Sequence, residues 1–337
     1  MKEETTKTQN SHLDINEESS DKTEAYFTIH PMVLRIDTVQ SFNVFKKNST
    51  SDYELFHPAS KAYTSTVHGS IFKNSISRLY VKDSYKSDYY RYLENFFIIV
   101  MNDPFINSYT KAQISHDLIT YIAKLVCKKP EKEIIIRYKT IIKSITDFVI
   151  KDKDAINNII SMVNPSCTDY NHLVNVGIYG MGLAKEIFVK EINFDMSEIA
   201  AGFFLHDIGK LNIPKHIIHK QGILTDREWK IIKTHPLEGY NILKKLDVLT
   251  KESEIIVLQH HERHDGNGYP KGLQGDQIHK FSKICSIADA FDALTSYRPF
   301  RKSKSSFEAL QVMYSEMKNE FDPTFFSKFV LLFRRTK

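Results

Sequence analysis

The C-terminal half of the chain holds a dense set of histidine and aspartate residues. Imidazole and carboxylate groups are the ligands that borderline and hard divalent metal ions prefer. None of the three cysteines is obviously placed to join them, which argues against a structural zinc site. The set therefore indicates a metal centre with nitrogen and oxygen ligands, and its members are His172, His206, Asp207, His235, His260, His261 and Asp289.

His206 and Asp207 are adjacent at the expected end of a helix that begins near Ser197. The residues that follow, 208–214, are predicted to form a loop. Two ligands at a helix end can point into one cavity. Because a carboxylate has two oxygens, Asp207 could bridge two metal ions.

His260 and His261 are also adjacent, and within a helix neighbouring side chains diverge by about 100°. The pair can flank one metal only near a helix end, which the glycine-containing turn at 266–268 supplies. Asp289 is expected on a helix over 286–294. A lone histidine on a helix is usually not a ligand, so the interpretation depends on these residues in combination with nearby glycines and a proline.

Two longer motifs carry a resemblance to a known family. Residues 206–210 read HDIGK and residues 260–270 read HHERHDGNGYP. These motifs resemble those of the HD-GYP domain family, which are cyclic di-GMP phosphodiesterases of the HD superfamily. Further matching residues lie at 220–225, 235–239 and 289–299, so the resemblance covers about residues 155–330, roughly half of the chain.

The resemblance implies an all-helical domain and a bacterial second-messenger signalling hydrolase with two divalent metal ions, iron or manganese in most such members. One ion would be held by His172, His206, Asp207 and Asp289, and the other by Asp207, His235, His260 and His261. Asp207 and a water or hydroxide would bridge the two ions. Two such ions lower the pKa of a shared water, and the resulting hydroxide attacks phosphorus.

The resemblance also implies catalytic and substrate-binding residues. Asp207 would act in catalysis with Lys210, which would offset charge on the phosphoryl oxygens. Arg298 and Arg301 match positions that contact substrate, and guanidinium suits phosphate geometry. Tyr269 would line the substrate pocket, with a protein-contact surface or a purely structural role as alternatives.

Asp292 lies one helical turn beyond Asp289, and we expect it to contact a metal ligand rather than the metal. Some family members place a glutamate, which helps to bind a third metal ion, where this chain has Thr168. Asp169 is an uncertain substitute for that glutamate. We therefore predict two metal ions rather than three.

The motifs predict hydrolysis of the phosphodiester of cyclic di-GMP to pGpG, with GMP as a further product. A phosphodiesterase for another cyclic dinucleotide or phosphoester is one alternative. A catalytically weak signalling module that binds a cyclic dinucleotide is another. Turnover of cyclic di-GMP, lost when His206 or Asp207 is replaced by alanine, separates the last reading from the first.

Composition limits the possible partners and the location. The net charge of +5 would help to attract an anionic substrate, but it is too small to argue for duplex nucleic acid. No apolar run approaches the roughly 20 residues that span a bilayer. No N-terminal segment resembles a secretory signal. We therefore expect a cytoplasmic protein without membrane insertion.

The composition and the hydrophobic pattern divide the chain into four parts. Residues 1–24 are predicted to be a disordered tail, because they have few groups to bury. Residues 25–85 indicate a small α+β or β-rich domain that we expect to be regulatory, with strands near 26–29, 33–36, 42–45 and 78–81. Residues 86–153 form connecting helices over 89–101, 108–126 and 131–150. Residues 154–337 form the all-helical HD-GYP domain.

The first helix of the motif region is expected to begin after Thr225, which forms a capping box with Glu228, and to run through His235 to about Leu246. The connecting helices could pair between subunits in a homodimer. We expect a chain shortened to begin near Lys151 to keep some activity, because no catalytic cluster precedes it.

Overall fold

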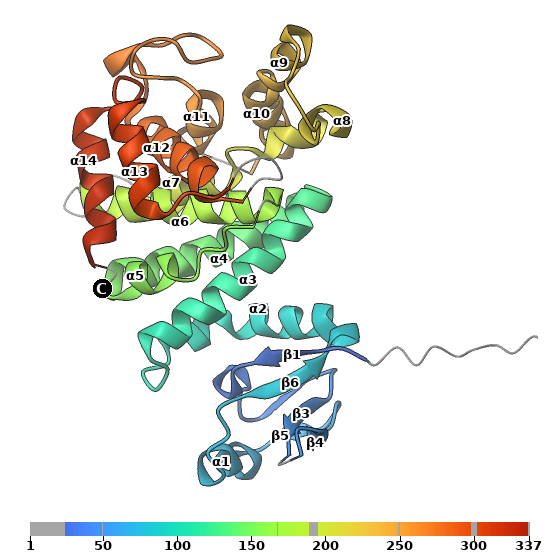
Figure 1. Ribbon diagram of the computed structural model, residues 1–337. Helices are drawn as coiled ribbons and strands as arrows, with labels where there is room; N and C mark the ends of the chain where they lie inside the picture. The colour runs from blue at the N-terminus through green and yellow to red at the C-terminus, as the bar shows by residue number, and fades with distance from the viewer. Residues whose placement is uncertain are drawn as a thin grey trace, which may run out of the picture.

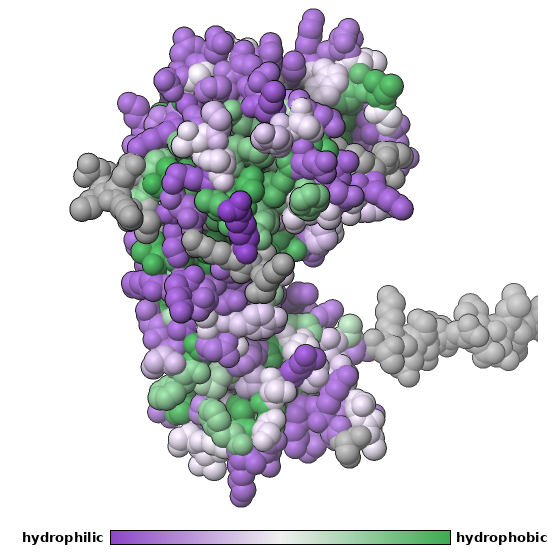
Figure 2. All heavy atoms as spheres, turned by 60° about the vertical axis from the view of Figure 1, so that its left-hand side comes forward, coloured by the Kyte–Doolittle hydropathy of each residue, from purple (hydrophilic) through white to green (hydrophobic). Residues whose placement is uncertain are grey.

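The computed structural model describes residues 24–48, 50–166, 168–188, 195–248, 250–297 and 302–335. The molecule is elongated, with a small sheet at one end and a helical domain at the other (Figure 1). Except for Glu24, the predicted tail lies outside the described residues. Figure 2 shows hydrophilic side chains over most of one face, with hydrophobic side chains in patches on both lobes.

The N-terminal domain is built on a four-stranded antiparallel sheet with the order β1-β6-β3-β4. A second, two-stranded sheet pairs β2 with β5, and a short helix follows it. The elements are β1 (Tyr26–Ile29), the 3-10 helix η1 (Pro31–Val33), β2 (Thr38–Val39), β3 (Val44–Lys47), β4 (Tyr53–His57), β5 (Ala62–Tyr63), α1 (Ser65–Lys73), β6 (Leu79–Lys82) and the 3-10 helix η2 (Asp83–Tyr85).

Three of the four predicted strands lie on or close to observed ones, but the strand predicted at 33–36 is wrong. Pro31 begins a 3-10 helix there, and His30 Nδ1 accepts a hydrogen bond from the Met32 amide at 3.2 Å. Asp37 then adopts a left-handed conformation with φ 61°, which ends the extended segment.

Three long helices follow, close to the predicted spans: α2 (Lys86–Asn102), α3 (Ser108–Lys128) and α4 (Lys132–Lys151). Pro104 and Pro130 lie in the two breaks. Arg137 of α4 donates two hydrogen bonds of 2.7 Å to Glu94 of α2. Lys139 of α4 forms an ion pair with Glu198 of α7 (Met196–Leu205) at 2.9 Å, so these helices contact the C-terminal domain directly.

The C-terminal domain is helical, which together with the small N-terminal sheet confirms the predicted fold class. Its other elements are α5 (Ala155–Ile160), α6 (Asp169–Phe188), η3 (Ile208–Asn212), α8 (Lys215–Ile218), α9 (Asp226–Ile232), α10 (His235–Leu246), α11 (Lys251–Gln259), η4 (Gly275–Gln277), α12 (Lys280–Thr295), α13 (Ser306–Ser315), α14 (Pro323–Leu332) and η5 (Phe333–Arg335). One hydrophobic cluster extends from Ile29 in β1 to Leu332 in α14. Among the described residues, none of the helices combines the length and the apolar character needed to cross a bilayer.

The single helix predicted from Thr225 to about Leu246 is wrong, because the structure has two helices there. The predicted capping box of Thr225 and Glu228 is present and begins α9. Pro236, in the first turn of α10, has no amide hydrogen to donate to the Ile232 carbonyl. That carbonyl instead accepts a hydrogen bond from His235 Nδ1 at 2.7 Å. The break therefore also fixes the orientation of a candidate metal ligand.

Candidate metal centre

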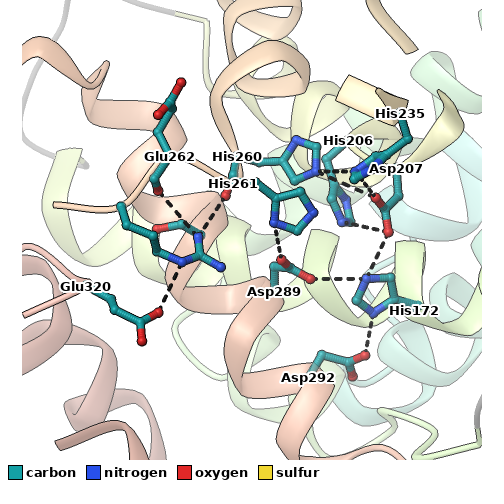
Figure 3. A network of polar contacts seen from close by, with 12 residues as sticks. His172, His206, Asp207, His235, His260, His261, Glu262, Asp289, Asp292 and Glu320 are labelled. Atoms are coloured by element: carbon teal, nitrogen blue, oxygen red, sulfur yellow. Dashed lines mark hydrogen bonds and ion pairs between the residues drawn. The ribbon is translucent and has the colours of Figure 1, made fainter. Parts of the chain in front are cut away.

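All seven predicted ligands converge on one site in the C-terminal domain (Figure 3). They come from five helices or helix ends. His172 lies on α6, His206 and Asp207 lie between α7 and η3, His235 begins α10, His260 and His261 follow α11, and Asp289 lies on α12. The helix carrying Asp289 begins six residues earlier than the predicted start at 286.

The Asp207 carboxylate lies between two groups of histidines. Its Oδ1 is 3.0 Å from His235 Nε2 and 3.6 Å from His260 Nε2. Its Oδ2 is 3.2 Å from His172 Nε2 and 3.5 Å from His206 Nε2. Two sets of possible ligand atoms, each within 4.8 Å of one another, therefore share this residue: Asp207, His235, His260 and His261 form one, and His172, His206 and Asp207 form the other.

Three of the histidines have the same hydrogen-bond arrangement. His206, His235 and His260 place Nδ1 at 2.9, 2.7 and 2.8 Å from the carbonyl oxygen three residues earlier. A carbonyl oxygen only accepts, so each Nδ1 carries the hydrogen and a neutral ring leaves a lone pair on Nε2. The three rings are fully buried, and their Nε2 atoms all face the Asp207 carboxylate.

This arrangement concentrates lone pairs at one point. The Nε2 atoms of His235 and His260 are only 3.1 Å apart. His206 Nε2 and Asp207 Oδ1 are buried, and neither has a hydrogen-bond partner among the described residues. A buried polar atom of this kind destabilises the folded state unless another group or an ion binds it. Cations between the nitrogens and the carboxylate would satisfy them, so the residues present fit a metal centre.

The pKa directions of two of these buried histidines and of Asp207 agree with this description. Burial lowers the pKa of His206 to about 3, and burial also lowers the pKa of His260, so both rings stay neutral and able to bind a metal near neutral pH. Burial would raise the pKa of Asp207, but the positive charge of the nearby Lys210 holds it well below the usual range. Asp207 therefore stays ionised.

His172 is oriented by Asp292, which the structure places in a buried position on α12. His172 Nδ1 lies 2.7 Å from Asp292 Oδ2, and its Nε2 faces Asp207 Oδ2 and Asp289 Oδ1 at 3.2 and 3.3 Å. Asp292 Oδ1 accepts from Asn175 Nδ2 at 2.8 Å and from Ser296 Oγ at 3.1 Å. The sequence analysis missed Asn175, although it lies one helical turn after His172.

Lys210 contacts the Asp207 carboxylate from one turn further along the chain. Burial would lower the pKa of its ammonium group, but Asp207 and Asp289 raise it above its ordinary value. Lys210 also lines a small cavity with Cys127 of α3 and with Asp169. The Thr168 hydroxyl accepts a hydrogen bond from the Asn171 amide at 3.3 Å.

Tyr269 lies on the other side of the centre. Its ring stacks on His261 with centroids 4.6 Å apart. Burial raises the pKa of its hydroxyl, and Asp207 and Asp289 raise it further. The loop that carries it is fixed by the buried Glu262, which accepts hydrogen bonds from the Lys271 and Leu273 amides at 2.8 and 2.9 Å.

A cavity of about 780 Å³ opens beside Tyr269 and His261. One wall is α9, and the other is the loop after α11 together with Glu320. Its volume is within the range of about 300–1,000 Å³ that is typical of small-molecule sites. Of the predicted substrate-binding residues, Tyr269 lines this cavity, whereas Lys210 lines the small one. Arg298 and Arg301 lie outside the described residues.

Comparison with known proteins gives one family. The HD domain family matches residues 154–325. The cyclic di-GMP phosphodiesterase response regulator RpfG of Xanthomonas campestris is 38% identical over 42% of this chain and 37% of its own length. The cyclic di-GMP phosphodiesterase PA4108 of Pseudomonas aeruginosa is 32% identical over 56% of this chain and 45% of its own length.

A third relative, the 3'3'-cGAMP-specific phosphodiesterase 3 of Vibrio cholerae, is 33% identical over 46% of this chain and 33% of its own length. The chain thus spans less than half the length of these curated relatives. Among solved structures, the HDG"Y"P protein Bd1817 of Bdellovibrio bacteriovorus matches with a TM-score of 0.64 and 19% identity. The match covers 92% of this chain and all of that one, which supports the fold.

Proposed function

Because the chain belongs to the HD domain family, we propose that it is a metal-dependent phosphodiesterase that hydrolyses a cyclic dinucleotide. Cyclic di-GMP is the substrate we favour, with pGpG as the product and GMP on further cleavage. The curated relatives are named for cyclic di-GMP or for 3'3'-cGAMP, which supports this class of substrate.

One observation carries the proposal: the buried Asp207 carboxylate faces two groups of histidines whose Nε2 lone pairs point toward it. A carboxylate in this position suits two divalent ions, iron or manganese, with Asp207 between them. When bound, two such ions lower the pKa of a shared water and stabilise charge on phosphoryl oxygens. His172, His206 and Asp289 would hold one ion, and His235, His260 and His261 the other.

The remaining residues position the substrate and offset charge. Lys210 keeps its positive charge beside Asp207 and would stabilise negative charge on the phosphoryl group. Tyr269 stacks on His261, and both residues line the large cavity. Asp292 holds the His172 ring so that Nε2 faces the centre. Arg298 and Arg301 remain proposed phosphate contacts on the resemblance alone.

A second cyclic dinucleotide, 3'3'-cGAMP, is the alternative that a specific observation favours. Relatives from Vibrio cholerae at 33%, 35% and 37% identity are named as specific for it. The ratio of kcat/KM for cyclic di-GMP and 3'3'-cGAMP, measured on one preparation, decides between the two substrates.

We also propose that the chain forms a homodimer through the connecting helices. Ile98 and Ile99 of α2 and Ile136 of α4 are exposed, and α2 and α4 are neighbours. Sedimentation equilibrium tests this: a dimer that becomes monomeric in the Ile98→Glu/Ile136→Glu variant supports it, and a monomeric wild type contradicts it.

The central experiment combines metal analysis and turnover on protein purified without added metal and kept anaerobic. About two iron or manganese ions per chain and the appearance of pGpG would support the proposal. Two ions with tight nucleotide binding and no cleavage would favour a signalling module that binds its ligand without hydrolysis. Absence of metal after reconstitution would refute the metal centre.

A further inference from the structure

Helix α9 presents one face to the large cavity. Asp226, Trp229, Lys230 and Lys233 all line it, and their spacing of three, four and seven residues places them on the same side of a helix. None of the residues of α9 is buried. Figure 1 shows α8, α9 and α10 as a group that projects from the rest of the helical domain. The side chains of this face are therefore available to a ligand in the cavity.

Trp229 is the chain's only tryptophan, and 46% of its surface is exposed. Tryptophan side chains are enriched at surfaces that contact other molecules. Bases of single-stranded nucleotides stack on aromatic side chains of this kind, because every base has a flat π surface. A cavity that holds both an open indole ring and cationic groups fits a nucleotide better than an apolar ligand.

Lys233 lies between Trp229 and the metal centre. It follows Trp229 by one helical turn, and its Nζ is 5.4 Å from the centroid of the Tyr269 ring, which stacks on His261. The third cation of the cavity, Arg263, is already paired with Glu320 at 3.2 Å. Within the described part of the chain, Lys233 forms no ion pair with a carboxylate. Its charge is thus available to a phosphate.

We propose that α9 is the nucleotide-binding wall of the cavity: Trp229 stacks on one base of the cyclic dinucleotide, and Lys233 contacts its phosphodiester backbone. This inference rests on the proposed function, since it assigns the residues that hold the substrate of that site. Neither residue acts in the chemical step. Their loss should weaken substrate binding without removing the metals.

The first test measures the fluorescence of Trp229. It uses metal-stripped protein, which does not turn over substrate. Titration with cyclic di-GMP should change the tryptophan fluorescence in a saturable way, because the stacked base contacts the only indole ring in the chain. An unchanged emission spectrum at nucleotide concentrations that saturate binding by calorimetry would overturn the inference. Such a result would leave the proposed reaction intact.

The second test measures kcat and KM for cyclic di-GMP in Trp229→Ala and Trp229→Phe. The alanine variant should raise KM about 5- to 150-fold, the range expected for one base–aromatic stack, with kcat nearly unchanged. The phenylalanine variant should recover most of the loss, because it keeps an aromatic surface. Phe307→Ala is the matched control, because Phe307 is an exposed aromatic residue on α13 that does not line the cavity.

The third test replaces Lys233 with alanine and compares it with Lys245→Ala, an exposed lysine on α10. Lys233→Ala should raise KM and make it less sensitive to salt, whereas Lys245→Ala should do neither. Equal KM values for Trp229→Ala and wild type would overturn the inference, and so would loss of metal in that variant. If wild-type protein cleaves no cyclic dinucleotide, the proposed function fails instead, and the fluorescence titration still tests α9.

Discussion

Asp207 is the residue on which both halves of the metal centre depend. Its two oxygens face different histidines, so Asp207→Ala should release both metal ions. Asp289→Ala removes a carboxylate that we assign, with His172, to one of the two ions, and it should mainly affect that ion. Elemental analysis of the two variants after gel filtration measures this difference. Full metal occupancy in Asp207→Ala would contradict the bridging role.

Asp292 acts through His172 rather than on the metal. The carboxylate of Asp292 accepts hydrogen bonds from three groups, which belong to His172, Asn175 and Ser296. In Asp292→Asn the NH2 group of the amide would face one of these donors and could not accept from it. Asp292→Asn should therefore lower metal affinity at the His172 side about 10- to 100-fold. Competition with a chelator measures the affinity, with the exposed Glu316→Gln as control. Equal affinities in Asp292→Asn and wild type would show that His172 needs no such support.

At this scale much of the site could be predicted from the sequence. The HDIGK and HHERHDGNGYP motifs led to ligands that the fold brings together, because motif spacing depends on local geometry. Asn175 was missed, since a single asparagine on an apolar helix carries no distinctive pattern. Trp229 was missed as well. Its exposure to the cavity depends on how α9 packs against neighbouring elements such as α8, which periodicity does not reveal.

Close backbone contact between η3 and α10 holds His206, Asp207 and His235 together. A Cβ atom on Gly209 would overlap the carbonyl oxygen of His235 and the amide of Gly239. Gly209→Ala should therefore push η3 away from α10 and lower both the stability, by about 1–3 kcal/mol, and the metal content. Thermal melting and elemental analysis measure the two effects.

The control for this variant is Gly69→Ala, because a Cβ atom on Gly69, within α1, would meet no atom within 4 Å. It should stabilise the protein by about 0.5–1 kcal/mol, since alanine favours a helix over glycine. A Gly209→Ala variant as stable and metal-loaded as wild type would mean that η3 and α10 can separate without disturbing the site.

The sequence located the long helices well, because their periodicity is long and their breaks are marked by prolines. It failed at the junction of α9 and α10, where the helical pattern continues across the break. Pro236 is compatible with the first turn of a helix as well as with the interior of a kinked one. The Ile232 carbonyl, which accepts from the His235 side chain three residues later, favours the break.

The N-terminal domain is joined to the helices by a partly buried ion pair. Arg35 contacts Asp103, at the end of α2, at 2.7 Å, and the side chains are 16% and 13% exposed. Burial would raise the pKa of Asp103, but its hydrogen bond with Arg35 brings it below the ordinary value. The stabilisation is therefore complete above the unfolded-state pKa of about 3.9 and is lost as the pH falls through the folded-state pKa.

Asp103→Asn should accordingly lower stability at pH 7 by about 1.5–3 kcal/mol, the usual contribution of a hydrogen bond between charged groups. The difference from wild type should shrink as the pH falls below about 4. Thermal melting across this range measures it. Glu54→Gln, in an exposed pair with Lys46, should have little effect at any pH. A difference that does not change with pH would contradict the ionic contribution of Asp103.

The connecting helices form part of the same hydrophobic core as the C-terminal domain, which changes the expectation for shortened chains. α3 packs against α6, and α4 packs against α7. A chain that begins near Lys151 would expose these apolar faces, and we now expect it to aggregate. A chain that begins at Asn107 keeps α3 and α4 and should retain metal. Light scattering measures aggregation of the two shortened chains, and elemental analysis measures their metal content. A soluble, metal-loaded chain that begins near Lys151 would support the expectation that it keeps some activity.

The junction between α9 and α10 has a consequence for the energetics of the whole molecule. The last residue of α9, Ile232, supplies the carbonyl that orients His235, and other residues of the same short helix line the large cavity. A nucleotide that restricts the motion of α9 also restricts the motion of the His235 imidazole. Thermodynamic reciprocity then requires metal and nucleotide to raise each other's affinity by the same factor. A shortage of the metal would therefore lower the affinity of the protein for the cyclic dinucleotide.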